Sequence, residues 1–247
     1  MIDDPTSPTG DPTVERKCAT ADGSLRLCID FEDPATDATD GSGRNHHPVV
    51  VDGLTTLDRD AGGGAIELAV EMSAQSKLQI AEHADLDIAT NLTVSMWVNT
   101  STRPAAGSSY WLLDNNNQYS ISMQPSGAIR CGLGASTVDS AAQLNVSGGG
   151  WHQVACTYDG EELKVYIDGW VRGCRDVDRP ISTTGTDGLS IGSNIGAGPV
   201  FNDKFVGGLD NVQVFARTFS PAELCAANGN DWCNPSCDWF GANGDDD

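Results

Sequence analysis

The feature that most limits the fold is the regular succession of short apolar runs and turn-forming clusters between residues 25 and 219. Each run is alternating or β-branched, and Gly, Asn and Asp separate it from the next run. Alternation with a period of two places one set of side chains on a buried face. The pattern therefore predicts an all-β antiparallel sandwich. Clear examples are LRLCIDF, NLTVSMWVNT, YSISMQ, HQVACTY, LKVYID, LSIGS and DNVQVFAR.

Turn residues predict the local order of strands in the middle of the chain. Asp-Gly pairs at positions 159–160 and 168–169 flank the run EELKVYI, and Asp-Gly favours tight hairpin turns. We expect a meander of three antiparallel strands over residues 151–174. One short helix is predicted at SPAELCAAN, which carries an N-cap serine, a proline at the first helical position and a glutamate that completes a capping box.

The charge of the chain excludes some classes of partner. Fourteen Lys and Arg residues stand against 35 Asp and Glu residues, which gives a net charge of −21. Such a chain repels phosphate backbones and anionic membrane surfaces. The sequence also contains no apolar stretch long enough to span a membrane. We therefore expect neither nucleic-acid binding nor a transmembrane segment.

The eight cysteines indicate a disulfide-bonded protein. They form an even set without any Cys-x-x-Cys pair, so disulfides are favoured over zinc, and the expected compartment is extracytoplasmic. Cys18 and Cys28 flank an Asp-Gly turn and are expected to pair across a hairpin. One further bond is expected within each of two groups: Cys131, Cys156 and Cys174; Cys225, Cys233 and Cys237.

Both ends of the chain differ in composition from the middle. Residues 1–17 are acidic and rich in Pro and Thr, and residues 241–247 are Gly- and Asp-rich. We interpret residues 1–17 as a linker behind a removed export or lipid-anchor signal, and residues 241–247 as a disordered acidic tail. Residues 18–240 then form a single domain. The predicted location is secreted or at the cell surface.

Four segments resemble a known family. GGGWHQVACTYDGEELKVYIDGWV is similar to the central segment of laminin G-like jelly rolls, and GGLDNVQVFARTFSPAEL to their closing strand and short helix. LCIDFEDPATDATDGSGRNHH resembles the opening strand and its Asp-x-Ser-Gly loop, and NLTVSMWVNT the strand that bears the family's Trp. The resemblance covers residues 25–224. It implies a laminin G-like or concanavalin A-like jelly roll of the bacterial LamG type, with one concave sheet, that binds glycans or proteins or serves as an accessory module of an enzyme.

The resemblance also implies a structural calcium ion. In concanavalin A-like relatives, such an ion joins a carboxylate of the opening strand to an Asp of the last strand. Asp210 occupies the matching place on the last strand, Glu32 closes the opening strand, and Asp40 lies in the loop that follows. We expect Glu32, Asp40 and Asp210 to supply the oxygen ligands that calcium needs. The alternative is an acidic, solvated turn without a metal. His46 and His47 adjoin this loop and are expected to be exposed, because imidazole is not a favoured calcium ligand.

The run YWLLDNNNQY contains the aromatic and amide side chains that a sugar site needs. Alternation predicts that only one of Tyr110 and Trp111 faces outward. A second side of the site is expected from Trp170 and Arg172 with the loop at 198–203. The alternative is that these Trp side chains belong to the core. The candidate ligand-binding residues are Tyr110, Trp111, Asp114, Asn116, Trp170 and Arg172.

No pattern of catalytic residues supports an enzyme. The Glu-x-Asp-x-x-Glu pattern of glucanases with this fold is absent. GLSIG matches a nucleophile elbow in letters, but its all-β context makes Ser190 a strand residue. His152 is interpreted as a structural group. We therefore predict a non-catalytic module that binds carbohydrate, with adhesion to an extracellular protein, or a structural role at the cell surface, as the alternative.

Overall fold

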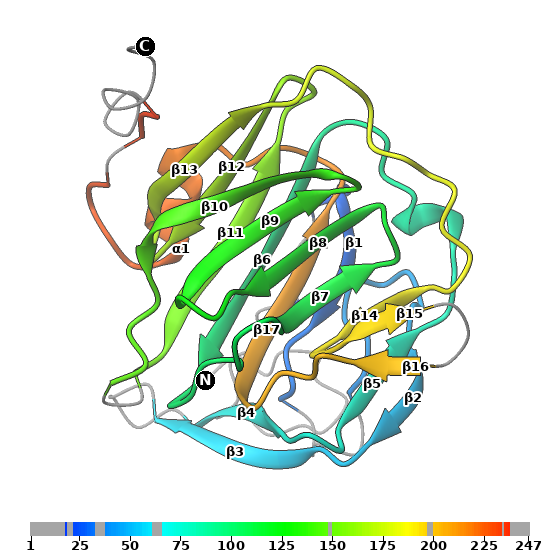
Figure 1. Cartoon of the computed structure of the whole chain (residues 1–247). Coiled ribbons are helices and arrows are strands. Elements are labelled where there is room, and N and C mark those ends of the chain that lie inside the picture. The colour runs from blue at the N-terminus through cyan, green and yellow to red at the C-terminus, as the bar shows by residue number, and fades with distance from the viewer. Residues whose placement is uncertain are drawn as a thin grey trace, which may run out of the picture.

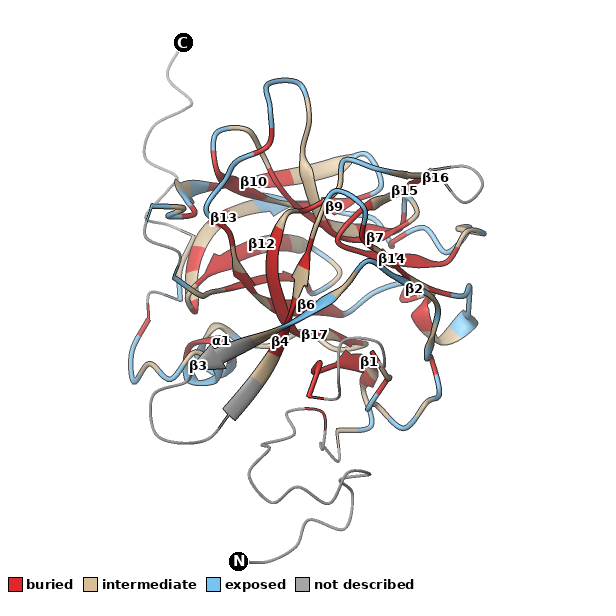
Figure 2. Cartoon of the chain, turned by 90° about the horizontal axis from the view of Figure 1, so that it is seen from below, coloured by how far each residue is buried: buried red, intermediate tan, exposed pale blue. Residues whose placement is uncertain are grey.

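The computed structural model describes most of the chain. The described residues are 18, 22–32, 38–60, 66–147, 150–196, 200–233 and 235–237. The expected linker at 1–17 and the expected tail at 241–247 lie outside them. Two large antiparallel sheets pack face to face, as the sequence predicts (Figure 1). Side chains from both sheets fill the core between them, and much of the strand backbone is coloured as buried in Figure 2.

The first sheet, called sheet A, has eight strands, with β1 beside β17 at its centre. In spatial order its strands are β13 (Trp170–Asp176), β12 (Glu162–Ile167), β11 (His152–Tyr158), β6 (Leu92–Asn99), β17 (Gly207–Phe215), β4 (Ile66–Met72) and β3 (Thr55–Asp60), with β1 (Leu25–Ile29) paired to β17. The meander expected over residues 151–174 is confirmed, because β11, β12 and β13 are consecutive antiparallel neighbours.

The second sheet, called sheet B, has seven strands and lies in front of sheet A in Figure 1. Its strands, in spatial order, are β10 (Ser136–Gln143), β9 (Ala128–Leu133), β8 (Tyr119–Met123), β7 (Tyr110–Asn115), β14 (Leu189–Ile191), β5 (Lys77–Ile80) and β2 (Pro48–Asp52). A small hairpin of β15 (Asn194–Gly196) and β16 (Val200–Asn202) lies beside it. One 3-10 helical turn, η1 (Ala84–Leu86), precedes β6.

Four disulfides connect the elements. The predicted bond between Cys18 and Cys28 is confirmed, and each of the two groups of three contains one bond. The bond between Cys131 of β9 and Cys156 of β11 joins the two sheets through the core. The remaining pairs are Cys225 with Cys233, and Cys174 with Cys237.

The predicted helix is α1 (Pro221–Ala227). The Ser220 side chain accepts a hydrogen bond from the Glu223 backbone, and the Glu223 side chain accepts one from the Ser220 backbone, so both halves of the capping box are present. Leu224 anchors the helix against Tyr166 on the outer side of sheet A. Within the described residues, no helix has the length and apolar character needed to cross a membrane.

Candidate functional site

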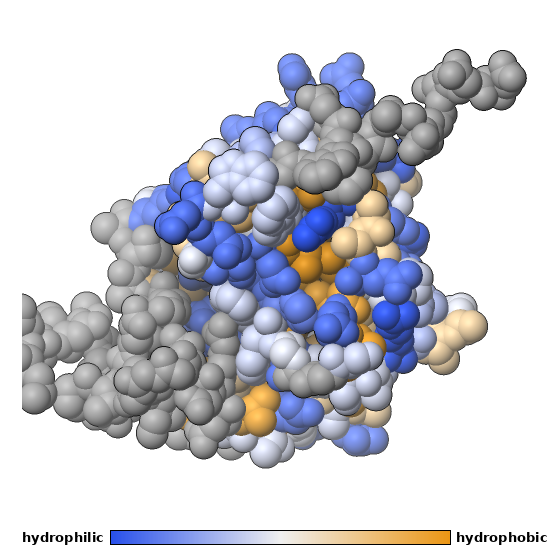
Figure 3. Space-filling model, turned by 90° about the vertical axis from the view of Figure 1, so that its left-hand side faces the viewer, coloured by the Kyte–Doolittle hydropathy of each residue, from blue (hydrophilic) through white to orange (hydrophobic). Residues whose placement is uncertain are grey.

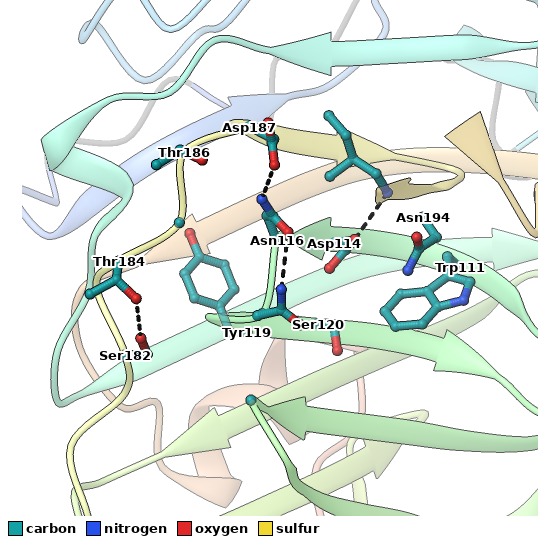
Figure 4. A pocket seen from close by; sticks show the side chains of 14 residues that line it. Trp111, Asp114, Asn116, Tyr119, Ser120, Ser182, Thr184, Thr186, Asp187 and Asn194 are labelled. Carbon is teal, nitrogen blue, oxygen red and sulfur yellow. Dashed lines mark hydrogen bonds between the residues drawn. The ribbon is translucent and has the colours of Figure 1, made fainter. Parts of the chain in front are cut away.

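A cavity of about 460 Å³ opens on the outer face of sheet B. Leu113 and Ile121 point into the core, so the neighbouring side chains of Asp114 and Ser120 point to the opposite face of the sheet. Figure 4 shows polar side chains from three segments directed toward this space. The lining consists of Trp111, Asp114, Asn116, Asn117, Tyr119, Ser120, Gly134, Ser182, Thr184, Gly185, Thr186, Asp187, Asn194 and Ile195.

A β-bulge in β7 brings Trp111 and Asp114 to the same face. Residues three apart in a regular strand face opposite sides of a sheet. Here Trp111 pairs with Ser122 but Leu113 pairs with Ile121, so Leu112 is an extra residue in β7. The bulge resets the alternation, and Trp111 and Asp114 both line the cavity.

Tyr110 lies outside the cavity. Its ring packs at the edge of the core, in an edge-to-face contact with Phe205 whose centroid lies 5.8 Å away. Its hydroxyl lies 3.2 Å from the Thr102 hydroxyl. Of the two adjacent aromatic residues, only Trp111 therefore offers a ring to a ligand in the cavity.

The turn between β7 and β8 forms one side of the cavity. The backbone N–H of Gln118 donates to the backbone carbonyl of Asn115 at 2.8 Å, which closes the turn. The central residues Asn116 and Asn117 have φ angles of 30° and 66°. Asn tolerates this left-handed conformation better than most residues. The Asn116 side-chain amide donates to an Asp187 carboxylate oxygen at 2.5 Å, which ties the turn to the opposite side of the cavity (Figure 4).

Residues 182–187 form that opposite side, and no motif in the sequence predicts their role. Gly185 lies so close to the turn that a Cβ there would be 2.8 Å from Gln118 Nε2. Ser182 and Thr184 share a hydrogen bond at 3.0 Å. The only signal in the sequence was a Ser, Thr, Gly and Asp cluster between two strands, which is also an ordinary loop composition.

Asp114 is the buried acid of the cavity. It is 3% exposed, and its carboxylate accepts a hydrogen bond from the Ile195 amide at 3.0 Å. Burial raises the pKa of Asp114 to about 6, although that hydrogen bond acts in the opposite direction. The group is thus close to half-protonated in mildly acidic solution, where it donates or accepts hydrogen bonds.

Trp170 and Arg172, expected on the second side of the site, lie elsewhere. Both belong to β13 at the edge of sheet A, and neither lines the cavity. The Trp170 ring is in edge-to-face contact with Trp232 at 5.3 Å, and the Arg172 guanidinium lies 5.5 Å from the Trp170 centroid. They form a separate aromatic cluster near α1. Part of the loop at 198–203, residues 198 and 199, lies outside the described residues.

Two of the three residues expected to bind calcium come from segments that meet at one end of the pair β1–β17. Ile29 of β1 lies opposite Val212 of β17, so Glu32, just after β1, and Asp210 belong to the same end of the pair. Both are buried, at 4% and 0% exposure. Asp30, which the sequence analysis did not name as a ligand, is buried in the same stretch.

Asp40 occupies a different position along β1. Its carboxylate accepts hydrogen bonds from the backbone of Cys28, Ser42 and His46 and from the Ser42 hydroxyl. It thereby holds the loop that follows β1 onto the strand. His47 is exposed, as expected, but the expectation that His46 is exposed is wrong. The bond from its backbone to Asp40 draws His46 inward, where it is 4% exposed.

The residues set aside as non-catalytic have structural environments. Ser190 lies within β14, is fully buried and shares a hydrogen bond of 2.6 Å with Ser193. His152 Nδ1 lies 2.8 Å from an Asp168 carboxylate oxygen, and the Asp168 carboxylate also accepts the backbone N–H of Gln153. Ser190 and His152 therefore form hydrogen bonds within the scaffold, from their positions in β14 and β11.

Solved structures with a similar fold include a domain of an arabinanase, a CBM40 and the binding domain of a mosquitocidal protein. Domain 4 of AbnA, a GH43 extracellular arabinanase from Geobacillus stearothermophilus, determined with arabinotriose, is 17% identical, with a TM-score of 0.60 over 82% of this chain and 97% of that domain. The CBM40 of a Ruminococcus gnavus sialidase, bound to α2,3-sialyllactose, is 21% identical, with a TM-score of 0.55 over 65% of this chain and 96% of its own length. The binding domain of Paraclostridial Mosquitocidal Protein 1 is 17% identical, with a TM-score of 0.63, and the match covers 83% of this chain and 52% of that one.

Sequence comparison gives the family. No curated protein sequence matches the chain. A laminin G profile, described as the concanavalin A-like lectin/glucanases superfamily, matches residues 72–225, which is more than half of the chain. Two of the structural neighbours named above are described as a binding domain and a CBM40, the third is one domain of an arabinanase, and this chain shares their fold. The protein therefore belongs to the concanavalin A-like lectin/glucanases superfamily.

Proposed function

We propose that this protein is a non-catalytic carbohydrate-binding module that holds a neutral oligosaccharide in the cavity on sheet B. The observation that carries the proposal is the position of the Trp111 ring beside Asp114, Asn116 and Asn194 in one hollow (Figure 4). An aromatic ring packs against the apolar face of a sugar, while carboxylate and amide groups bind its hydroxyls. A volume of about 460 Å³ lies within the range of small-molecule sites.

The lining favours a neutral sugar over an acidic one. Among the described residues that line the cavity, two are Asp and none is Lys or Arg. A negatively charged sugar would meet the carboxylates of Asp114 and Asp187 without a compensating cation. The neighbours named above include one domain determined with arabinotriose and another bound to sialyllactose. The charge of this cavity supports a ligand of the first, uncharged kind.

Calorimetric titration with a panel of neutral oligosaccharides, arabinotriose included, and with sialyllactose tests the proposal. We expect saturable binding of at least one neutral sugar, no binding of sialyllactose, and no shortening of the sugar during incubation. Trp111→Ala should weaken binding by at least about tenfold, because a stacked ring contributes roughly 1 to 3 kcal/mol. Trp170→Ala is the matched control, since Trp170 is also half-buried but lies on the other sheet. Equal affinities for the two variants would contradict the proposal.

Adhesion to an extracellular protein is the second candidate. Two large apolar side chains of β2, Val49 and Val51, are exposed at 62% and 36%, and β2 is an edge strand of sheet B. Exposed apolar side chains on an edge strand favour contact with another chain. Figure 3 shows a second group of apolar residues among hydrophilic ones on one side of the molecule. Val49→Lys together with Val51→Lys should leave sugar binding unchanged and abolish adhesion if the partner docks there.

We also propose a structural calcium ion at the end of β1 and β17. Asp30, Glu32 and Asp210 supply carboxylates, and Asn211 supplies a buried amide oxygen that accepts no hydrogen bond from the described residues. These hard oxygen donors fit calcium. The ion would neutralise buried negative charge and stabilise the folded state. Asp40 was predicted as a third ligand, but a cation there would compete with the four hydrogen bonds that its carboxylate accepts.

The four disulfides fit a secreted or cell-surface protein. We further propose that the acidic segment 1–17 tethers the domain, with a lipid anchor as the most direct means. Labelling of the native protein with a radioactive fatty acid, followed by proteolysis of residues 1–17, would release the label with that segment. Labelling that remains with the domain would contradict the tether.

A further inference from the structure

Three side chains that neither the sugar site nor the calcium proposal uses meet between the loop after β1 and the turn η1. They are His46, His83 and Asp85, and one ligand atom of each lies within 4.8 Å of the others. His46 Nε2 lies 3.1 Å from His83 Nδ1 and 3.7 Å from an Asp85 carboxylate oxygen. His46 is buried, whereas His83 and Asp85 reach solvent. The cluster thus consists of one buried side chain, His46, and two side chains that solvent can reach, His83 and Asp85.

The hydrogen bond from His46 to the backbone assigns the tautomer of its ring and leaves its Nε2 as an acceptor toward His83. His46 Nδ1 lies 2.8 Å from the Arg26 carbonyl oxygen, and only an N–H group bonds to a carbonyl, so Nδ1 carries the proton in the neutral ring. His46 Nε2 is then an acceptor. His83 Nδ1 accepts the Asp85 backbone N–H at 3.1 Å with its one lone pair, so a metal ion bound at Nδ1 would replace that hydrogen bond. The two facing nitrogens, His46 Nε2 and His83 Nδ1, are 3.1 Å apart and are bridged either by a hydrogen on His83 Nδ1 or by a metal ion bound to both.

The spacing fits a metal ion. Zinc bonds to nitrogen and carboxylate oxygen at about 2.0 to 2.2 Å, which places neighbouring ligands of a tetrahedral ion about 3.3 to 3.6 Å apart. The observed separations of 3.1 and 3.7 Å lie close to that range. Two imidazoles and one carboxylate suit late first-row transition metals and do not suit calcium. The Arg26 carbonyl holds the His46 tautomer, which is the usual outer support of a metal-bound imidazole.

We propose that His46, His83 and Asp85 form a binding site for Zn²⁺ or a related divalent transition metal, with water as the fourth ligand. The ion would join the loop after β1 to η1, two segments that are 37 residues apart at His46 and His83. Arg44 donates to the Asp85 carboxylate at 3.1 Å and already holds it toward the loop. The site is separate from the cavity and from the carboxylates at the end of β1 and β17.

The turn η1 also connects this site to the cavity. The Leu86 carbonyl accepts hydrogen bonds from the Asn115 side chain and the Tyr119 hydroxyl, both at 3.1 Å. Tyr119 belongs to the cavity lining. A metal ion that fixes η1 therefore also supports the hairpin of β7 and β8.

Titration of the oxidised full chain, free of any histidine tag, with ZnCl₂ tests the proposal. Millimolar CaCl₂ is present throughout to occupy sites made of carboxylates alone. We expect about one equivalent of zinc to bind with a saturable heat and to raise the melting temperature. Substitution of Co²⁺ should give visible absorption bands of the intensity that four-coordinate cobalt shows.

Variants of the exposed ligands separate a metal site from a structural contact. His83→Ala should reduce zinc affinity at least tenfold, and Asp85→Asn should also reduce it. His47→Ala, the exposed histidine next to His46, is the matched control and should bind zinc as the wild type does. Because His83 is exposed, its variant is expected to fold, and circular dichroism checks this before titration. Absence of saturable zinc binding, or equal affinity in His83→Ala, would overturn the proposal and assign a proton to the place between the rings.

Discussion

The two sheets of this sandwich differ in what they contribute. Sheet A contains most of the segments that carry the family resemblance, including the meander β11 to β13 and the closing strand β17. Sheet B contains the cavity, which depends on a bulge, a turn and a loop. Packing constrains the residues of a buried scaffold, whereas loops and outer faces vary with the ligand. The family is therefore visible in sheet A, whereas the proposed sugar site lies on sheet B.

The two sheets also differ in how many buried acidic residues lie together. On sheet B, Asp114 faces a cavity, and burial raises its pKa to about 6. At the end of β1 and β17 in sheet A, Asp30, Glu32 and Asp210 are buried in one region of the fold. A single acid avoids the cost of burial by taking up a proton, whereas a group of acids is better compensated by a shared cation. Four experiments test these differences between the two sheets and the link that joins them.

The largest effect on the unfolding free energy is expected from removing the covalent link between the two sheets. Cys131→Ala combined with Cys156→Ala removes the disulfide that crosses the core, and the closed loop of about 26 residues predicts a loss of roughly 3 kcal/mol in unfolding free energy. Urea denaturation measures it. The double variant Cys225→Ala and Cys233→Ala opens a shorter loop near α1 and should cost less. An equal or larger loss there would contradict a core that depends on the link between sheets.

The next effect concerns the acids of sheet A. If calcium binds there, calcium at 100 times its dissociation constant should raise the unfolding free energy by about 2.7 kcal/mol relative to chelator. Asp210→Asn should abolish this increase. Asp52→Asn, an exposed acid on β2, is the control and should retain it. A calcium-dependent increase that survives in Asp210→Asn would refute the assignment of the ligand, and an unchanged wild type would refute the site.

A smaller effect is expected at Asp114 on sheet B. Its folded pKa of about 6 exceeds the reference value of 3.8, so the unfolded chain ionises first as pH rises. The contribution of Asp114 to stability is therefore complete below about pH 4, and roughly 2 kcal/mol of it is lost as pH rises from 4 through the folded pKa to 7. Asp114→Asn should remove this dependence between pH 4 and 7, as measured by urea denaturation. Parallel pH profiles for wild type and variant would contradict the buried acid.

The smallest effect belongs to the half-buried pair of His152 and Asp168 in sheet A. The hydrogen bond to Asp168 raises the pKa of His152, so the stability from this pair is complete below about pH 6.5 and is lost as pH rises through the raised folded value. His152→Gln should cost less than about 1 kcal/mol at pH 5.5 and still less at pH 8.5, since the pair is partly solvated. A larger cost at pH 8.5 would reverse the assigned sign.

Local patterns in the sequence were enough to predict much of the scaffold. The Asp-Gly turns at 159–160 and 168–169 predicted the meander, because their geometry is decided within four residues. The capping box at Ser220 and Glu223 predicted α1 in the same way. For the cavity, composition identified Trp111, Asp114 and Asn116 as candidates but also Tyr110, Trp170 and Arg172, which lie outside it.

The tertiary structure decided what depends on contacts between distant segments. Register of β7 against β8 places the bulge at Leu112, and no property of the single strand reveals it. The side formed by residues 182–187 meets the turn at Asn116 only when the chain is folded. The same holds for His46, which was expected at the surface because imidazole is not a favoured calcium ligand, and which the fold buries. The sequence by itself determined the strands, turns and hairpins, because periodicity and turn chemistry act over a few residues. The tertiary structure determined the cavity on sheet B, because its side chains converge from segments about 70 residues apart.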